Sequence, residues 1–153
     1  MIIRHATVAD IPDIAAVEAE CFPPAEAAKE KDFVDRVKEY GNHFWLMYDG
    51  DKLIAFVAGM VRDEADLVDE MYSDASMHNE NGAWQMIFGV NIIPAYRKRG
   101  LAGELIQRAI DDARAQGRKG LILTCKDKLI HYYEKFGFMD EGVSDKSTHG
   151  NVA

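Results

Sequence analysis

The stretch HFWLMYDGDKLIAFVAGMV, residues 43–61, constrains the fold of this chain more than any other part of its sequence. Two apolar runs flank Asp49-Gly50, a dipeptide that accepts the positive φ angles of a tight hairpin turn. The second run, residues 53–61, is apolar at nearly every position, so we expect both of its faces to be buried. A strand that is covered on both sides indicates a layered structure of sheet and helices.

The segments around this hairpin alternate between strand and helix patterns. Before the hairpin we expect a strand over residues 2–6, a helix from Thr7 or Asp10 to about Cys21, and one or two helices over 25–40. After it we expect a polar excursion over 62–82 with one helical turn, a single strand over 83–93 and a helix over 100–116. The chain is then expected to form a buried strand over 119–125, a helix over 127–136 and a last strand over 138–143. Gly89 interrupts the strand over residues 83–93, where glycine often marks a bulge. The predicted class is a mixed α/β (α+β) sheet flanked by helices.

Composition narrows the class of protein and of partner. The 153 residues are predicted to form one domain, and 48% hydrophobic with 29% charged residues is typical of a soluble globular protein. A net charge of -8 argues against a nucleic-acid partner and mildly favours a cationic substrate. Cys21 and Cys125 form no CxxC pair, so we expect no metal site and no disulfide framework. Without a signal-peptide core or a membrane-spanning apolar run, the expected location is cytoplasmic, with no membrane partner.

The stretch YRKRGLAGEL, residues 96–105, concentrates positive charge at the start of a predicted helix. Cations at this end of a helix oppose its dipole, so the arrangement indicates a bound anion rather than a plain surface loop. Unpaired backbone N–H groups in the first turn bind phosphate, and Gly100 allows close approach to the backbone. Because GxxxxGK[ST] and GxGxxG are both absent, a P-loop or Rossmann nucleotide site is disfavoured, and pyrophosphate is the predicted anion.

Two motifs resemble those of the GNAT superfamily of acyl-CoA-dependent N-acetyltransferases. RKRGLA, residues 97–102, matches its [QR]xxGx[GA] motif, and YYEKFGF, residues 132–138, is similar to its C-terminal helix-and-strand signature. Within the superfamily the chain most resembles the arylalkylamine (serotonin) N-acetyltransferases and their bacterial relatives, through ECFPPAEAA, LIAFVAG and LILTCKDKLIHYYEKFGF. The resemblance implies a mostly antiparallel sheet with a bulged strand before the cofactor loop.

The resemblance also implies a site for acetyl-CoA. Backbone groups of the bulged strand would hold the pantetheine arm, and backbone amides of the following loop and helix start would cradle the pyrophosphate, with help from the cations. The cofactor residues expected on this basis are Val90, Asn91, Ile92, Arg97, Lys98, Arg99, Gly100, Leu101, Ala102 and Gly103.

Acetyl transfer to an amine requires a proton donor for the leaving thiolate and a route for the amine proton. By resemblance, Tyr133 is the general acid, four residues before Gly137, while Tyr132 points elsewhere on the helix. The histidine positions of the serotonin enzymes align with Met86 and Phe88, neither of which can move a proton. Glu70 is therefore the predicted base; the other candidates from the same polar excursion are Asp69 and His78, and a weaker one is His149.

The resemblance also implies an acceptor pocket beside the end of the first helix. Phe22 and Pro23 follow that helix, and Met86 and Phe88 offer apolar side chains, although all four are also compatible with ordinary structural roles. The predicted activity is transfer of acetyl to the primary amine of a small molecule, such as an arylalkylamine. The alternatives are a lysine or N-terminal protein acetyltransferase and a non-catalytic acyl-CoA sensor. The protein is expected to be a monomer or homodimer, and the sequence leaves open whether a partner supplies a final strand.

Overall fold

The structure is a computed structural model that describes residues 1–142. Its strands are β1 (Ile2–His5), β2 (Phe44–Asp49), β3 (Lys52–Ala58), β4 (Val61–Arg62), β5 (Trp84–Ile87), β6 (Gly89–Ile92) and β7 (Gly120–Leu123). Its α-helices are α1 (Ile11–Cys21), α2 (Glu30–Tyr40), α3 (Glu70–Ser73), α4 (Leu101–Ala115) and α5 (Ile130–Glu134). Short 3-10 turns are η1 (Val8–Asp10), η2 (Gly41–His43), η3 (Ala75–Met77), η4 (Pro94–Tyr96) and η5 (Asp127–Leu129). The mixed α/β class predicted from the sequence is confirmed.

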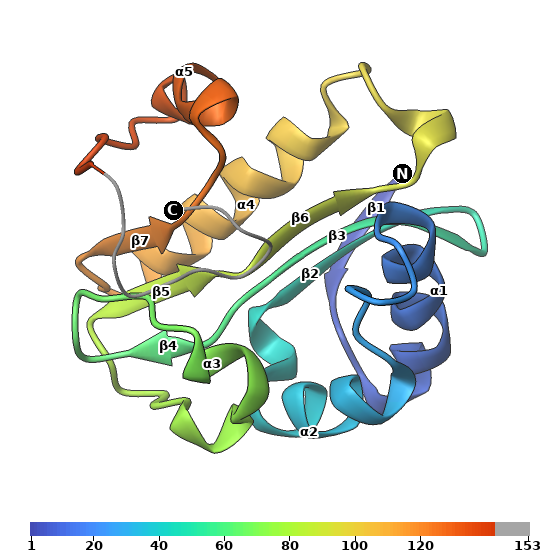
Figure 1. The fold of residues 1–153 in the computed structure, drawn as a ribbon, viewed down its shortest axis with the longest axis horizontal. Coiled ribbons are helices and arrows are strands. Elements are labelled where there is room, and N and C mark those ends of the chain that lie inside the picture. The colour runs from blue at the N-terminus through green and yellow to red at the C-terminus, as the bar shows by residue number, and fades with distance from the viewer. Residues whose placement is uncertain (143–153) are drawn as a thin grey trace.

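Two sheets form the centre of the molecule (Figure 1). The first has the order β1-β2-β3-β6 with every pair antiparallel, and the predicted hairpin forms its middle, with Gly50 at φ 60 in the turn. The second has the order β4-β5-β7, in which β5 and β7 run parallel. Most strand pairs are therefore antiparallel, as the sequence predicted.

The expected single strand over residues 83–93 is wrong in one respect, because it divides at Phe88 into β5 and β6, which belong to different sheets. The cause is a close crossing opposite Gly59. A Cβ on Gly59 would lie 1.9 Å from the carbonyl oxygen of Met86, so only glycine allows the two segments to approach. Backbone bonds from Phe88 N to Ala58 O (2.7 Å) and from Met86 N to Met60 O (2.8 Å) then join the two sheets.

The division of this strand opens the sheet beside β7. Strand β7 pairs with β5 from Gly120 to Leu123, whereas β6 continues along β3 toward the loop before α4 (Figure 1). Among the described residues, β6 pairs only with β3, so its other edge is left without a strand neighbour. The fold therefore places an unpaired strand edge next to the start of α4.

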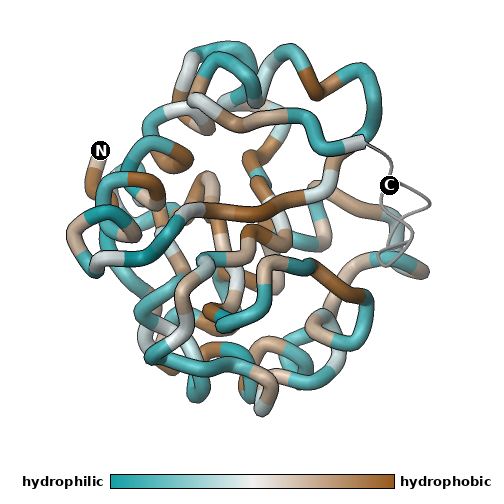
Figure 2. Tube along the Cα trace, turned by 90° about the vertical axis from the view of Figure 1, so that its left-hand side faces the viewer, coloured by the Kyte–Doolittle hydropathy of each residue, from teal (hydrophilic) through white to brown (hydrophobic). Residues whose placement is uncertain are grey.

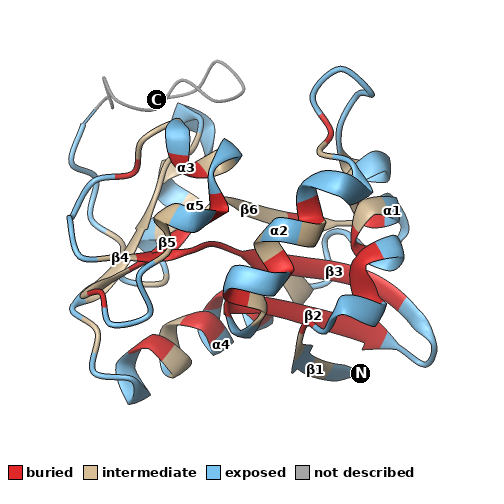
Figure 3. Cartoon of the chain, turned by 90° about the horizontal axis from the view of Figure 1, so that it is seen from below, coloured by how far each residue is buried: buried red, intermediate tan, exposed pale blue. Residues whose placement is uncertain are grey.

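Helices cover both faces of the sheet. Helices α1 and α2 pack on one face, and α4 packs on the other (Figure 3). Apolar residues gather on the central strands, while the outer turns are mostly hydrophilic (Figure 2). The centre of β3 is almost inaccessible, with Ile54, Ala55 and Val57 at 0% exposure, as its apolar sequence predicted. No helix of the described part of the chain is long and apolar enough to cross a membrane.

Three expectations near the C-terminus require correction. Strand β7 is half-buried rather than buried. The helix expected over residues 127–136 is a 3-10 turn followed by the short α5, which ends at Glu134 before Gly137 at φ 96. Residues 138–142 form no strand, and the expected end of that strand at Val143 lies outside the described residues. None of the residues of β7, η5 and α5 is fully buried, and the local sequence pattern did not indicate this.

Candidate functional site

The loop before α4 has the backbone of an anion site. Lys98 has φ 63 and Gly100 has φ 75, ψ 8, so two left-handed residues stand directly before the helix. Alternation of left-handed residues with ordinary backbone conformations turns successive N–H groups toward one side. The first turn of α4 adds N–H groups that have no partner within the helix. The first intrahelical bond, from Glu104 N to Gly100 O, is 3.3 Å long. The anion site predicted from the sequence falls on this loop.

A cavity of about 180 Å³ adjoins this loop. The residues that line it are Ile92, Arg97, Lys98, Gly100, Leu101, Ala102 and Tyr132. All but Tyr132 were predicted as cofactor residues. The structure therefore brings the end of β6, the cationic loop and the start of α4 around one hollow.

Helix α5 and the residues that follow it pack against the start of α4. A Cβ on Gly103 would lie 3.2 Å from the Phe136 ring and 3.9 Å from the Tyr132 hydroxyl, so the glycine makes room for both side chains. Tyr132 was expected to point elsewhere on its helix, but it lies against the loop before α4 and the first turn of that helix. The Gly-x-x-Gly spacing of residues 100–103 was the signal that a side chain packs closely there.

Every second residue of β6 directs its backbone N–H and C=O groups to the free edge of the strand. Ile93 N donates to Ile54 O at 3.0 Å, which fixes the phase of the antiparallel ladder. By the alternation of such a ladder, the backbone of Asn91 faces β3, whereas Val90 and Ile92 face the unpaired edge. Of the three residues predicted to hold the pantetheine arm, Val90 and Ile92 direct their backbone groups to the open edge, whereas the backbone of Asn91 is directed away from it.

The three cations of the loop differ in their surroundings. Arg97 turns back toward β6, and its Nε donates to Ile92 O at 3.0 Å. The thiol of Cys21 reaches the same carbonyl at 3.4 Å, and burial raises its pKa against the opposing effect of Arg97. Arg99 stacks its guanidinium on Tyr96, 5.0 Å from the ring centroid, while Lys98 lines the cavity. Arg97 and Lys98 are therefore the cations closest to the predicted anion.

On the side of α2 and α3, the junction between β5 and β6 carries a group of aromatic side chains. The Phe88 ring lies 4.7 Å from that of Tyr72 and 6.4 Å from that of Tyr40. Met86, by contrast, is 0% exposed and belongs to the core, so its side chain lines no open surface. Phe22 is 39% exposed at the end of α1, and Pro23 is exposed beside it. Of the four predicted acceptor residues, Phe88 is the one that joins an aromatic group at the strand junction.

A polar pair crosses between α1 and β6 on this face. Asn91 is 3% exposed, and its Nδ2 donates to Glu18 Oε1 at 2.7 Å. The second oxygen of Glu18 accepts from Ala28 N at 3.0 Å. The sequence analysis missed Glu18, although it follows Ile11 and Ile14 on the apolar face of α1, where a carboxylate is unexpected.

Known proteins share this architecture. The sequence model of the acetyltransferase (GNAT) family matches residues 11–138, which include the open edge of β6, the loop and α5. The chain belongs to the acetyltransferase (GNAT) family. Serotonin N-acetyltransferase of Mesocricetus auratus is 26% identical over 96 residues, which are 62% of this chain but only 45% of that protein. The chain thus spans less than half of this relative.

Solved GNAT structures share the fold. The GphF GNAT-like decarboxylase in complex with isobutyryl-CoA superposes with a TM-score of 0.74 at 20% identity, over 91% of this chain and 73% of that one. The ribosomal-protein-S18-alanine N-acetyltransferase of Escherichia coli gives 0.69 at 19% identity, over 93% and 79% of the two chains. At these identities the likeness concerns the fold.

Tyr133, the predicted general acid of this GNAT chain, is partly buried on α5. Its ring packs against those of Tyr132 at 5.2 Å and Phe138 at 5.9 Å. Burial raises the pKa of Tyr133 to about 12, with a further contribution from Cys125. A phenol with this pKa keeps its proton at neutral pH, which is the state that a proton donor requires.

The predicted bases lie away from the loop. Glu70 is exposed at the first position of α3, and among the described residues its side chain makes no hydrogen bond. Asp69 precedes it at the N-cap position of the same short helix. His149 lies outside the described residues. The structure therefore does not bring Glu70 into contact with the residues around the cavity.

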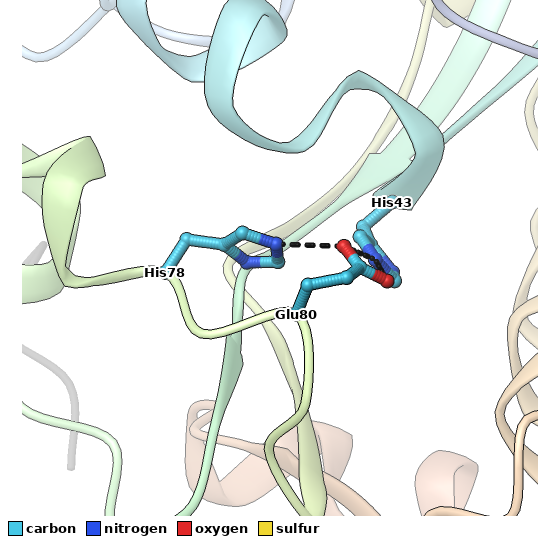
Figure 4. A group of neighbouring side chains, drawn as sticks. All are labelled: His43, His78 and Glu80. Atoms are coloured by element: carbon cyan, nitrogen blue, oxygen red, sulfur yellow. Dashed lines mark hydrogen bonds and ion pairs between the residues drawn. The ribbon is translucent and has the colours of Figure 1, made fainter.

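His78 belongs to a separate cluster with His43 and Glu80 (Figure 4). Its Nδ1 accepts from Val61 N at 3.0 Å, so the proton of the neutral ring is on Nε2, which donates to Glu80 Oε1 at 2.9 Å. Both ring nitrogens are occupied. His78 is therefore not free to act as a base on an acceptor.

The same cluster is the group in the described structure best placed to hold a metal, since its ligand atoms lie within 4.8 Å of one another. His43 Nδ1 lies 2.8 Å from Gln85 Oε1, which leaves Nε2 to face Glu80 at 3.0 Å. His78, however, would have to give up the proton on Nε2 to bind a cation. Glu80 also accepts from Arg118 at 3.1 Å. The hydrogen bonds therefore favour a structural polar cluster over a metal centre.

Proposed function

We propose that this GNAT protein transfers the acetyl group of acetyl-CoA to a primary amine of a small molecule, by direct attack within a ternary complex. The observation that carries the proposal is the meeting of an unpaired strand edge with a helix N-terminus at one hollow. A strand edge binds the amide groups of an extended chain, and the helix start binds phosphate. Pantetheine joined to pyrophosphate is a ligand with both features.

The residues present suit such a cofactor. Left-handed backbone at Lys98 and Gly100 directs N–H groups of the loop, and Arg97 with Lys98 adds positive charge beside the cavity. Val90 and Ile92 offer backbone groups along the open edge of β6. Acetyl-CoA supplies an activated acetyl thioester; the chain supplies its orientation, and Tyr133 holds a proton for the thiolate that leaves.

The acceptor is a small amine in this proposal because the relative in Mesocricetus auratus is a serotonin N-acetyltransferase, and because Phe88 joins Tyr72 and Tyr40 in an aromatic group. A second candidate is a basic protein segment. It is favoured by a hollow of about 490 Å³ between α1 and the β2–β3 turn, whose lining includes Asp13, Glu20, Asp49 and Asp51. Its acidic lining would attract a cationic peptide.

Release of thiol from acetyl-CoA tests the proposal. The assay compares a panel of arylalkylamines, polyamines and lysine-containing peptides, with CoA binding measured separately by calorimetry. We expect an arylalkylamine to accelerate release most. Tyr133→Phe is expected to lower kcat by about 10²-fold with little change in CoA affinity, since proton transfer typically contributes that much. Tyr132→Phe is the matched control and is expected to act mainly on CoA affinity.

Three outcomes would contradict parts of this scheme. Tight CoA binding with no acceptor that accelerates release would favour a non-catalytic sensor. Faster release with peptides than with any small amine would favour the protein substrate. Unchanged turnover in Tyr133→Phe would remove the general-acid assignment.

A further inference from the structure

Asn91 has a buried carbonyl oxygen that the described structure leaves without a hydrogen bond. Its Nδ2 donates to Glu18, but Oδ1 is buried and has no partner among the described residues. The orientation of the amide is fixed, because the carboxylate of Glu18 can only accept and so must face the NH2 group. A buried acceptor without a donor loses its hydration with no compensating hydrogen bond, so native structures rarely retain one without a reason.

The hydrogen-bond partner of the Asn91 amide, Glu18, is itself an acceptor. Glu18 Oε1 and Oε2 each accept one hydrogen bond, from Asn91 and from Ala28, and each retains a second lone pair. Together with Asn91 Oδ1 they form a small region that accepts hydrogen bonds and carries negative charge. A ligand that complements it must bring N–H donors and positive charge, which describes a primary ammonium group.

The position of this region matches that of an attacking nucleophile. Asn91 lies between Val90 and Ile92, whose backbone groups face the open edge of β6, while its own side chain faces α1. A thioester held at that edge would therefore be one residue away from the Asn91 amide. Gly89 contributes no side chain on this face, and a Cβ there would lie 3.3 Å from Asn91 Oδ1. Any side chain at residue 89 would therefore crowd this carbonyl oxygen.

We propose that Glu18 and Asn91 bind the acceptor amine as its ammonium ion, and that Glu18 accepts the proton that makes the amine nucleophilic. This inference rests on the proposed acetyl transfer and replaces Glu70 as its base. Of the three ammonium protons, one goes to Glu18, one remains on the amide nitrogen and one ends on the CoA sulfur through Tyr133. The new C–N bond forms as the C–S bond breaks, and Glu18 later returns its proton to solvent.

The test compares Glu18→Gln with Glu39→Gln, an exposed residue of the neighbouring helix α2. Glutamine at position 18 retains an acceptor for Ala28 N but loses the charge and the basicity. With the best amine found in the panel, we expect Glu18→Gln to lower kcat/KM for the amine by at least about 10²-fold. The acidic limb of its pH–rate profile should also disappear, while the Kd for CoA stays within about twofold. Glu39→Gln should leave all these quantities unchanged.

Gly89→Ala supplies an independent variant that leaves the Glu18–Asn91 bond intact. The added methyl group crowds Asn91 Oδ1, so we expect KM for the amine to rise about tenfold with unchanged affinity for CoA. If Glu18→Gln lowered only the melting temperature and kept the rate and its pH profile, Glu18 would be a structural clamp and the inference would be wrong. If no amine accelerated thiol release even in the unaltered protein, the proposed function itself would fail.

Discussion

At the residue scale, the cofactor loop depends on backbone conformations that few side chains tolerate. Gly100 has φ 75, a region that costs an L-residue about 1–2 kcal/mol. A Cβ there would meet no atom of the described structure within 4 Å, so the requirement is conformational rather than steric. The cations beside it add charge, but the direction of the N–H groups comes from the backbone. We therefore expect Gly100 to matter more to the proposed anion site than any single side chain.

Gly100→Ala should weaken CoA binding at least about tenfold, or 1.4 kcal/mol, because relief of the strain turns the loop amides away from the ligand. Arg99→Ala should have a smaller effect, since Arg99 stacks on Tyr96. Gly117→Ala is the matched control: Gly117 also has positive φ, at 77, and follows the other end of α4. It should lose similar stability but keep its Kd for CoA in calorimetry. Equal loss of affinity in both variants would show that strain in general, not the loop, determines binding.

At the element scale, the site exists because two neighbouring segments bend at the same place. Strand β3 continues through Gly59 into β4, and β5 continues through Phe88 into β6, so the chain passes between sheets twice. Among the described residues, the parallel strand β7 pairs only with β5. The bend thus separates β6 from β7 and exposes the backbone edge that the cofactor is proposed to use.

Gly59→Ala should destabilise the protein by about 3 kcal/mol or more, because the methyl group would overlap the backbone carbonyl of Met86 at 1.9 Å. Urea denaturation monitored by circular dichroism measures the loss. Gly89→Ala, in the partner segment of the same bend, is the control, since its Cβ would meet only the Asn91 side chain at 3.3 Å and should cost much less. Similar stability of the two variants would show that the crossing tolerates more separation than the structure indicates.

At the scale of the whole molecule, buried ionic groups connect distant elements and make stability depend on pH. Burial alone would raise the pKa of Asp10, but hydrogen bonds from Arg4, Thr7 and Tyr48 lower it well below its ordinary value. These bonds join β1, β2 and the start of α1. A carboxylate whose pKa is depressed on folding stabilises the protein above its unfolded pKa of about 3.9 and loses this contribution as the pH falls.

Lowering the pH from 7 should therefore reduce the free energy of unfolding, with about 2 kcal/mol from Asp10 lost below about pH 5. His43 also destabilises the protein as the pH falls, and its effect begins at a higher pH than that of Asp10. Burial lowers the pKa of His43 against the opposing effect of Glu80, so the free energy of unfolding decreases as the pH drops below about 6.5. Urea titrations at a series of pH values check this. Asp10→Asn should be less stable at pH 7 and show a flatter acid limb. An acid limb as steep as that of the unaltered protein would exclude Asp10 as its source.

Local patterns in the sequence were sufficient to predict most of the fold and the position of the loop before α4. The apolar run of β3, the Asp49-Gly50 turn and the helix stripe of α4 each depend on neighbouring residues, and the structure has all three. The RKRGLA motif located the helix start in the same way. Helical and strand periodicity, turn glycines and helix dipoles are properties of contiguous chain, so the sequence by itself determined them.

Only the tertiary structure decided which residues surround the strand junction. The division of residues 83–93 depends on Gly59, more than twenty positions earlier, because it arises from contact between two chain segments. The bond of Glu18 to Asn91 and the placement of Tyr132 beside Gly103 are likewise contacts between distant elements. A side chain's partner across a sheet is fixed by packing and register, which no local pattern encodes. The loop proposed to hold the cofactor could therefore be located from the sequence, whereas the proposed amine site required the folded chain.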